Sequence, residues 1–184
     1  KRSRIQGVVG AHWSTDYDFQ NLTLIDVEII AASESEIAAK NIVNNGGGSA
    51  LNGANVTCIR CRIHYVPTGI SLGNGSTIQD SYISDVTWGP GAHQAAIGAG
   101  GNSGHNSVIS HNRLDCSRWN VNAPGFEQGC SSALSLYDEP TLNNVLVQNN
   151  LFDTAGGYCT YGGGPQGTNI RYLNNRFGKK YNAT

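Results

Sequence analysis

Apolar and polar residues alternate in six nine-residue segments of the chain, which align with one another without gaps. In every segment the fourth residue is apolar, and the ninth is Ile, Leu or Phe. A strand with one buried face shows this alternation, because successive side chains point to opposite faces. We therefore predict a short strand at the start of each segment and a return to the core at its ninth residue. These segments, called modules below, are Asn21–Ile29, Asn55–Ile63, Gly75–Ile83, Asn106–Leu114, Asn144–Phe152 and Asn169–Phe177.

Asparagine recurs at fixed positions of the modules. It occupies the first position of five of the six, and in the later ones it also occupies the seventh, as Asn112, Asn150 and Asn175. Asparagine tolerates the left-handed backbone conformation, and stacked amides can hydrogen-bond along a ladder. We therefore predict a corner at the sixth and seventh positions of each module. The sixth-position row, which includes His111, fits a solvent-facing turn better than the lining of a groove.

Short apolar triplets lie between the modules and predict another parallel sheet. The modules start at intervals of 34, 20, 31, 38 and 25 residues, so a constant strand unit alternates with spacers of variable length. This organisation is typical of a solenoid of about six coils and not of a helical repeat, whose period is more constant. The triplets, aligned as in-out-in, are Ile70–Leu72, Ala95–Ile97, Leu134–Leu136 and Cys159–Tyr161.

The modules resemble the repeat of right-handed parallel β-helix proteins, whose signature is Asn-Val-x-Ile-x-Asn-Asn-x-Phe. The resemblance covers residues 21–178 and is strongest to secreted β-helix domains of the actinobacterial type. Pectate lyases, other polysaccharide lyases, polygalacturonase-like hydrolases and phage tailspikes share this superfamily. The resemblance implies an all-β fold, with one right-handed parallel β-helix domain spanning residues 1–184. Residues 1–20 are expected to form an N-terminal cap, since a solenoid must cover its terminal coils.

One segment departs from the strand pattern. Ser33 and Glu36 have the spacing of a capping box, an apolar stretch follows them, and Asn44–Gly48 supply a stop. We predict a short helix here, lying in a loop. At the other end only residues 178–184 follow the last module, so an end-to-end or C-terminal partner is expected there.

Composition agrees with short strands and turns. Only 14% of the residues are charged, whereas there are 24 glycines and 20 asparagines. The net charge is −1, but residues 5–170 hold five basic and 13 acidic residues, a net charge of −8. Such a body repels nucleic acid. No apolar run has the length of a transmembrane helix, so no membrane partner is expected.

The five cysteines and the absence of methionine fit a secreted, extracellular protein. We predict a disulfide between Cys116 and Cys130, which would close a loop. Cys58 and Cys61 are interpreted as stacked interior thiols, because no second pair or nearby histidines support a zinc site. An odd number of cysteines leaves at least one thiol free or paired outside this chain.

The long spacers carry the candidate binding residues. Aromatic rings beside carboxylates suit a sugar, which offers an apolar face to stack on and hydroxyls to hydrogen-bond. The two tryptophans can equally anchor their loops to the solenoid. The candidates for substrate binding are Trp88, Trp119, Asp85, Asp138 and Glu139.

Four residues are candidates for catalysis: His93, Asp115, Arg118 and Tyr137. His93 opens a segment similar to a His-Asn-Asp-Gly-Ile-Gln-like stretch of related β-helix domains, which implies a site residue. The acidic position of that stretch is Ala95 here, so a loop-anchoring role for His93 is an equal alternative.

A row of carboxylates is the second catalytic hypothesis. Asp85, Asp115 and Asp153 each lie one or two residues beyond a module, so neighbouring coils would align them about 4.8 Å apart. Such a row could act as an acid/base pair or hold Ca²⁺. A lyase would instead use a base such as Arg113, Arg118, His93 or Tyr137. We expect a module that binds an extracellular polysaccharide and cleaves it as a lyase or a hydrolase; the rival is a non-catalytic structural or adhesive solenoid.

Overall fold

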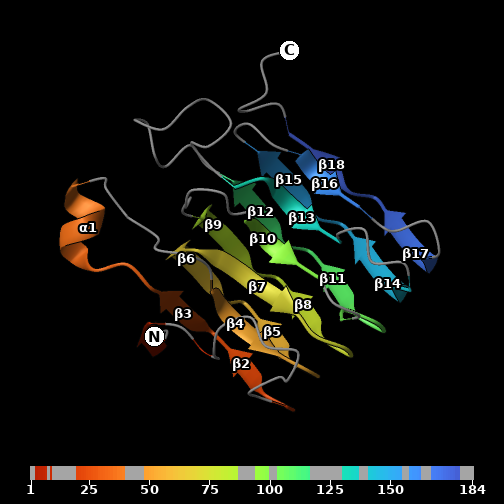
Figure 1. The fold of residues 1–184 in the computed structure, drawn as a ribbon, viewed down its shortest axis with the longest axis horizontal. Coiled ribbons are helices and arrows are strands. Elements are labelled where there is room, and N and C mark those ends of the chain that lie inside the picture. Colours follow the sequence, from red (N-terminus) through yellow and green to blue (C-terminus); the bar gives the residue numbers. More distant parts are fainter. Residues whose placement is uncertain are drawn as a thin grey trace.

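The protein consists of three parallel β-sheets and one short helix (Figure 1). The computed structural model describes residues 3–7, 9, 20–39, 48–86, 94–99, 103–116, 130–136, 141–154, 158–162 and 167–178. All strand pairs within the three sheets are parallel, as the modules and triplets predicted.

The strands of each sheet are stacked in chain order. The six-stranded sheet contains the first strand of each module: β2 (Thr23–Ile25), β5 (Thr57–Ile59), β8 (Thr77–Gln79), β11 (Val108–Ser110), β14 (Asn143–Gln148) and β17 (Thr168–Leu173). The seven-stranded sheet contains β1 (Ser3–Gln6), β3 (Val27–Ile30), β6 (Arg62–Val66), β9 (Tyr82–Val86), β12 (Arg113–Cys116), β15 (Leu151–Thr154) and β18 (Arg176–Phe177). The five-stranded sheet contains β4 (Ser49–Gly53), β7 (Thr68–Leu72), β10 (Ala95–Gly98), β13 (Ser132–Ser135) and β16 (Tyr158–Tyr161).

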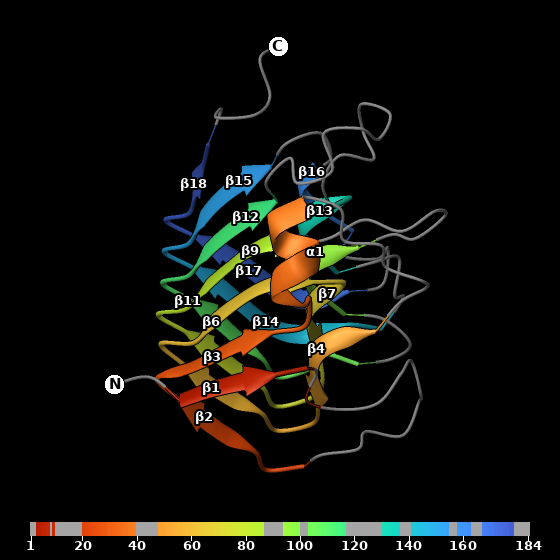
Figure 2. The same cartoon turned by 90° about the vertical axis from the view of Figure 1, so that its left-hand side faces the viewer.

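From β2 onward the chain visits the six-, seven- and five-stranded sheets in that order and then starts the next coil (Figure 2). Each complete coil therefore adds one strand to every sheet. This arrangement is compatible with a parallel β-helix. Within the expected N-terminal cap, β1 pairs with β3 and extends the seven-stranded sheet by one strand.

Apolar side chains from the same position of successive modules stack between the sheets to form the core. The ninth-position residues are registered partners on adjacent strands and are 0% exposed: Ile29, Ile63, Ile83, Leu114 and Phe152. Burying each such side chain stabilises the fold by about 2 kcal/mol. The return to the core at the ninth position is therefore as predicted in five modules. In the last module the prediction is wrong, because Phe177 lies on the terminal strand of its sheet, where no further coil covers it among the described residues, and it is 55% exposed.

The triplets form the expected third sheet, but their predicted register is wrong for two of them. Ile70 pairs with Ile97, Ile97 with Leu134, and Leu134 with Thr160. The run Ala95–Ile97 is thus displaced by two residues and Cys159–Tyr161 by one. In β10 the residues facing both sides of the sheet are buried, so apolar residues no longer alternate with polar ones and the pattern does not specify a register.

The corner between the six- and seven-stranded sheets has the same backbone in every coil. Residues at the sixth position all have φ between 51° and 56°, in the left-handed region. Residues at the first position also have positive φ, with Gly75 replacing asparagine in the third module. Short polar side chains tolerate this conformation best. The sixth-position residues are Asp26, Arg60, Asp80, His111, Asn149 and Asn174.

A hydrogen-bond ladder runs through the inside of this corner at the seventh position. The Asn112 side chain accepts from the backbone N–H of Ser81 and donates to the carbonyl of Ile78, both in the preceding coil and both at 2.9 Å. Asn150 and Asn175 repeat the two bonds in the following coils. Every rung pairs backbone groups that would otherwise be buried without a partner. The stacked asparagines predicted from the modules are confirmed.

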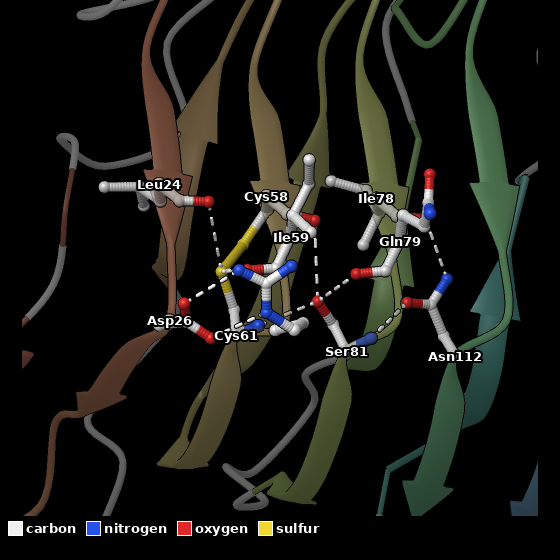
Figure 3. The surroundings of a disulfide bond; sticks show 10 residues. Leu24, Asp26, Cys58, Ile59, Cys61, Ile78, Gln79, Ser81 and Asn112 are labelled. Atoms are coloured by element: carbon white, nitrogen blue, oxygen red, sulfur yellow. Dashed lines mark hydrogen bonds and ion pairs between the residues drawn. A yellow bond between two sulfur atoms is a disulfide. The ribbon is translucent and has the colours of Figure 1, made fainter. Parts of the chain in front are cut away.

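Cys58 and Cys61 form a disulfide inside the same corner, with their Cα atoms 6.1 Å apart (Figure 3). Their interpretation as stacked thiols is therefore wrong. The two cysteines occupy the fourth and seventh positions of one module, and the left-handed residue Arg60 between them turns both side chains inward. Cys116 and Cys130 form the predicted disulfide, and Cys159 is a free thiol.

The predicted helix is present as α1 (Glu34–Ala39), which lies outside the three sheets (Figure 1). Its capping box is formed in both directions. The backbone N–H of Ser33 donates to Glu36 Oε2 at 2.8 Å, and the N–H of Glu36 donates to Ser33 Oγ at 3.3 Å. In the described part of the chain, no helix is long and apolar enough to cross a membrane.

Candidate functional site

Polar residues gather on the outer face of the seven-stranded sheet, one residue beyond the buried ninth position. Because successive strand residues face opposite sides, this tenth position points away from the core. The row is nevertheless buried, with exposed fractions between 1% and 6% for its polar members. In chain order the tenth-position row is Ile30, His64, Ser84, Asp115, Asp153 and Gly178.

Asp115 and Asp153 are registered partners on the adjacent strands β12 and β15. Arg113 lies between them: its Nη2 is 3.0 Å from Asp115 Oδ2 and 3.8 Å from Asp153 Oδ2. The two carboxylate side chains are 2% and 8% exposed, whereas that of Arg113 is 42% exposed. A Cβ atom at Gly178 would collide with Asp153 Oδ1, so only glycine leaves room for this carboxylate in the next coil.

Tyr82 extends the carboxylate pair by one strand. The guanidinium of Arg113 lies over the Tyr82 ring, 5.1 Å from the ring centre. The Tyr82 hydroxyl donates to Asp115 Oδ2 at 3.4 Å. Burial raises the pKa of Tyr82, and the nearby Asp115 adds to the effect. The phenol is therefore a hydrogen-bond donor at neutral pH.

His64 and Glu28 form a second pair, toward the start of the sheet. His64 Nε2 is 2.8 Å from Glu28 Oε1. The hydrogen bond from His64 lowers the pKa of Glu28, while burial lowers the pKa of His64 against the opposing effect of Glu28. At neutral pH the pair is thus an ionised carboxylate and a neutral ring. A carboxylate only accepts hydrogen bonds, so Nε2 carries the ring proton and Nδ1 has a free lone pair.

Ser84 and Asp85 occupy the space between the two pairs. Ser84 Oγ donates to Asp85 Oδ2 at 2.7 Å. Asp85 and the equivalent residue of the preceding coil, Tyr65, have φ of 51° and 52°. Among the described residues they are the only non-glycine residues with positive φ outside the first and sixth module positions. Such a conformation costs about 1–2 kcal/mol, and this strain lies next to His64 and Ser84.

Several buried polar atoms have no hydrogen-bond partner among the protein groups that the structure describes. A buried polar atom without a partner costs about 1–3 kcal/mol, so such atoms are rare outside functional sites. Within the described ranges none of these atoms belongs to the six-stranded sheet; all are on the seven-stranded sheet or at the start of strands of the five-stranded sheet. They are His64 Nδ1, Arg113 Nε, Thr68 Oγ1, Gln94 Nε2 and Gln94 Oε1.

The structure describes only part of the predicted site. Asp85 and Asp115 lie on the outer face of the seven-stranded sheet, and Asp153 joins Asp115 as the row of carboxylates predicted. Asp85 is one residue out of this row, because Ser84 takes the tenth position of its coil. The other predicted site residues lie outside the described residues and stay predictions: His93, Arg118, Tyr137, Trp88, Trp119, Asp138 and Glu139.

Sequence reasoning did not select His64, Glu28 or Tyr82. A signal for His64 exists, since it is the residue directly after a module, as Asp115 and Asp153 are. Glu28 and Tyr82 lie within modules at the eighth position, which faces outward like the tenth, and nothing in their local sequence marks them.

Among the residues that the structure describes, no group of three His, Cys, Asp or Glu side chains could hold a metal ion. The positive charge between Asp115 and Asp153 is supplied by Arg113. The two disulfides are compatible with an extracellular protein.

Comparison with models of protein families, with curated proteins and with solved structures found no match.

Proposed function

We propose that this protein is a secreted, right-handed parallel β-helix domain that binds an extracellular polysaccharide and hydrolyses it on the outer face of the seven-stranded sheet. The observation that carries the proposal is the pair of buried carboxylates, Asp115 and Asp153, on adjacent strands. Glycoside hydrolysis uses two such groups, one as general acid and the other as nucleophile or base.

The strand geometry also favours one stereochemical outcome. Registered residues of adjacent strands are about 4.8 Å apart, and carboxyl groups about 5 Å apart are typical of enzymes that retain the anomeric configuration. In this proposal Asp153 attacks the anomeric carbon. Asp115, which accepts from the Tyr82 hydroxyl, acts in its protonated form and gives its proton to the glycosidic oxygen as the bond from that oxygen to the anomeric carbon breaks. Water then attacks the anomeric carbon, gives one proton to Asp115 and displaces the Asp153 carboxylate, which restores both residues.

The charges around the pair favour a neutral glycan over a polyuronate. The two buried carboxylates, Asp115 and Asp153, share the single guanidinium of Arg113, so a uronate bound beside them would be repelled where a lyase needs its charge neutralised. Hydrolysis is therefore favoured over β-elimination. The described charged groups in contact or in electrostatic interaction here are Glu28, Asp85, Asp115, Asp153, Arg4, Arg62 and Arg113.

A panel of neutral and uronic polysaccharides tests the proposal. New reducing ends are expected from at least one neutral substrate, without the absorbance of unsaturated uronic products. Asp115→Asn and Asp153→Asn should each lower the rate of hydrolysis at least 100-fold. An amide can neither attack the anomeric carbon nor give a proton to the glycosidic oxygen.

Asp80→Asn is the matched control, since it removes an exposed carboxylate at a position where Asn149 and Asn174 occur in later coils. Its rate should equal that of the wild type. Unchanged rates in both Asp115 and Asp153 variants, or unsaturated products from a uronate, would contradict the proposal.

A second candidate, a solenoid that assembles through its last coil, rests on a separate observation. Large hydrophobic side chains are exposed on the final strand of all three sheets, where a further coil or another molecule would pack. Sedimentation of the wild type and of Phe177→Ser tests it; loss of a concentration-dependent oligomer in the variant is the expected result. The exposed side chains are Tyr158, Tyr161, Tyr172, Leu173 and Phe177.

A further inference from the structure

Three chemically complementary residues lie on three consecutive strands of the seven-stranded sheet. Glu28 is on β3, His64 on β6 and Ser84 on β9. His64 and Ser84 are registered partners, so their Cα atoms are about 4.8 Å apart. The carboxylate of Glu28 is 2.8 Å from His64 Nε2. The order carboxylate, imidazole, hydroxyl is that of a nucleophile activated by an oriented base.

The histidine is prepared to accept a proton. Its Nε2 is held by Glu28, and its Nδ1 is buried without any hydrogen-bond partner. The side chain of His64 is 7% exposed, so the ring lies away from bulk solvent. A free, buried lone pair beside a hydroxyl-bearing residue is costly for folding, and a function in proton transfer accounts for it.

To act as a nucleophile, the serine has to exchange its hydrogen bonds to Asp85 and to the Tyr82 phenol for one to His64. Ser84 Oγ donates to Asp85, and rotation about its Cα–Cβ bond would turn the hydroxyl toward the neighbouring His64. A residue with left-handed backbone follows each of the two catalytic candidates directly: Tyr65 follows His64, and Asp85 follows Ser84. Strain of this kind at two adjacent positions is a known feature of catalytic turns.

We propose that Ser84, His64 and Glu28 form a second active site, a serine acyl-transfer site that hydrolyses esters of small carboxylic acids. Ser84 and His64 are the catalytic residues, and Glu28 is a positioning residue. Because Ser84 is 1% exposed, the substrate is the ester of a small acid such as acetic acid, whose acyl group needs the least room. The proposal stands apart from the Asp115–Asp153 pair and does not require it.

The reaction balances without any cofactor. Ser84 Oγ forms a bond to the ester carbonyl carbon while its proton moves to His64 Nδ1. The bond from that carbon to the alcohol oxygen breaks, and the alcohol leaves with the proton from His64. Water then gives one proton to His64 and its hydroxyl to the acyl carbon. The bond from that carbon to Ser84 Oγ breaks, Oγ takes the proton back from His64, and the carboxylic acid is released.

Covalent labelling of the whole protein tests the site directly. A small alkyl fluorophosphonate is expected to form one adduct, located on Ser84 by peptide mass mapping, and p-nitrophenyl acetate is expected to be hydrolysed. Ser84→Ala should abolish labelling and lower hydrolysis at least 100-fold. Ser110→Ala, which removes a buried serine of the six-stranded sheet, is the matched control and should change neither.

Glu28 is tested by a measurement that a merely structural residue would not change. In Glu28→Gln the acidic limb of the pH–rate profile should move to lower pH, because a charge that favours protonated His64 is lost. Glu28→Asp should restore the limb toward the wild-type position.

The two proposed sites give separable results. Asp153→Asn should stop the release of reducing ends and leave ester hydrolysis intact, whereas Ser84→Ala should do the reverse. No adduct on Ser84, or ester hydrolysis that persists in folded Ser84→Ala, would overturn the acyl-transfer proposal. Circular dichroism of each variant confirms that it is folded.

Discussion

The inner corner and the outer face of the seven-stranded sheet are built from neighbouring residues of the same modules, yet they follow opposite rules. At the seventh position, asparagine recurs in the last three coils, and its side chain satisfies buried backbone groups. At the tenth position every coil carries a different residue except for Asp115 and Asp153. Buried atoms there, such as His64 Nδ1, have no partner.

In this protein the residues that hold the fold together and the residues available for chemistry occupy different positions of the repeat. A position that must bond to the coil before it and the coil after it can hold only residues that fit both. On the outer face the side-chain bonds between coils differ from one pair of coils to the next, as in His64–Glu28 and Arg113–Asp153, so no single residue type is required there. Function is therefore expected where the repeat is regular in backbone and irregular in side chains.

The largest effect is expected from breaking the ladder. Asn112→Ala leaves the N–H of Ser81 and the carbonyl of Ile78 buried without partners, which should lower the free energy of unfolding by about 3 kcal/mol. Urea denaturation measures the change.

The matched control for the ladder is Asn106→Gly. It removes an exposed first-position amide where the third module already has Gly75, and glycine accepts the positive φ without strain. A change below about 0.5 kcal/mol is expected. Equal losses in the two variants would show that the inner ladder is no more important than the exposed asparagines.

The Cys58–Cys61 disulfide is expected to have the next largest effect. It joins the fourth and seventh positions, which the other corners connect only by packing and hydrogen bonds. For a closed loop of this length the chain-entropy model predicts that Cys58→Ala/Cys61→Ser lowers the free energy of unfolding by about 2 kcal/mol. Thermal denaturation of the variant and the wild type provides the measurement; an unchanged midpoint would contradict the cross-linking role.

A smaller, pH-dependent effect is expected on the outer face. His64 has a folded pKa below its ordinary value of 6.5, so protonation favours the unfolded chain and stability falls as the pH drops through 6.5. The charged groups around the ring are Glu28, Arg62 and Asp85. The contribution of this one proton is at most about 1.4 kcal/mol per pH unit.

Urea denaturation between pH 7 and 5 tests this assignment. His64→Asn should lose stability less steeply than the wild type over that range. His111→Asn, which removes an exposed imidazole from the corner, should follow the wild type. The ionisation of Glu28 does not affect the slope between pH 7 and 5. Its folded pKa lies below 4.5, so the stability that it adds is lost only as the pH falls below 4.5. A slope unaffected by the His64 substitution would show that its ionisation is not coupled to folding.

The smallest effect is expected at an exposed sixth position. Arg60 pairs with Asp26 at 2.7 Å, but both side chains are about half exposed, where ion pairs add little. Arg60→Asn keeps a residue that tolerates positive φ, as Asn149 does in a later coil. No measurable change in the urea midpoint is expected, and a clear loss would reveal a structural role for this pair.

Most of the corner and little of the outer face could be predicted from the sequence. The capping box of α1, the Asn112–Asn150–Asn175 stack and the Cys116–Cys130 disulfide follow from spacings within or between modules. Cys58 and Cys61 were misinterpreted because their pairing depends on how far the left-handed residue between them turns the chain. The predicted register of β10 is wrong because both faces of that strand are buried, so its apolar residues do not alternate with polar ones.

The nine-residue pattern is enough to predict the strand modules, the corners and the stacking order, because each depends on residues within one unit and is repeated in every coil. Tertiary structure alone decided which outer-face side chains meet. Glu28, His64 and Ser84 come from modules that start 34 and 20 residues apart. Only parallel registration of their strands, after spacers of unequal length, brings them side by side. No local pattern encodes that proximity, because it arises from coiling the whole chain.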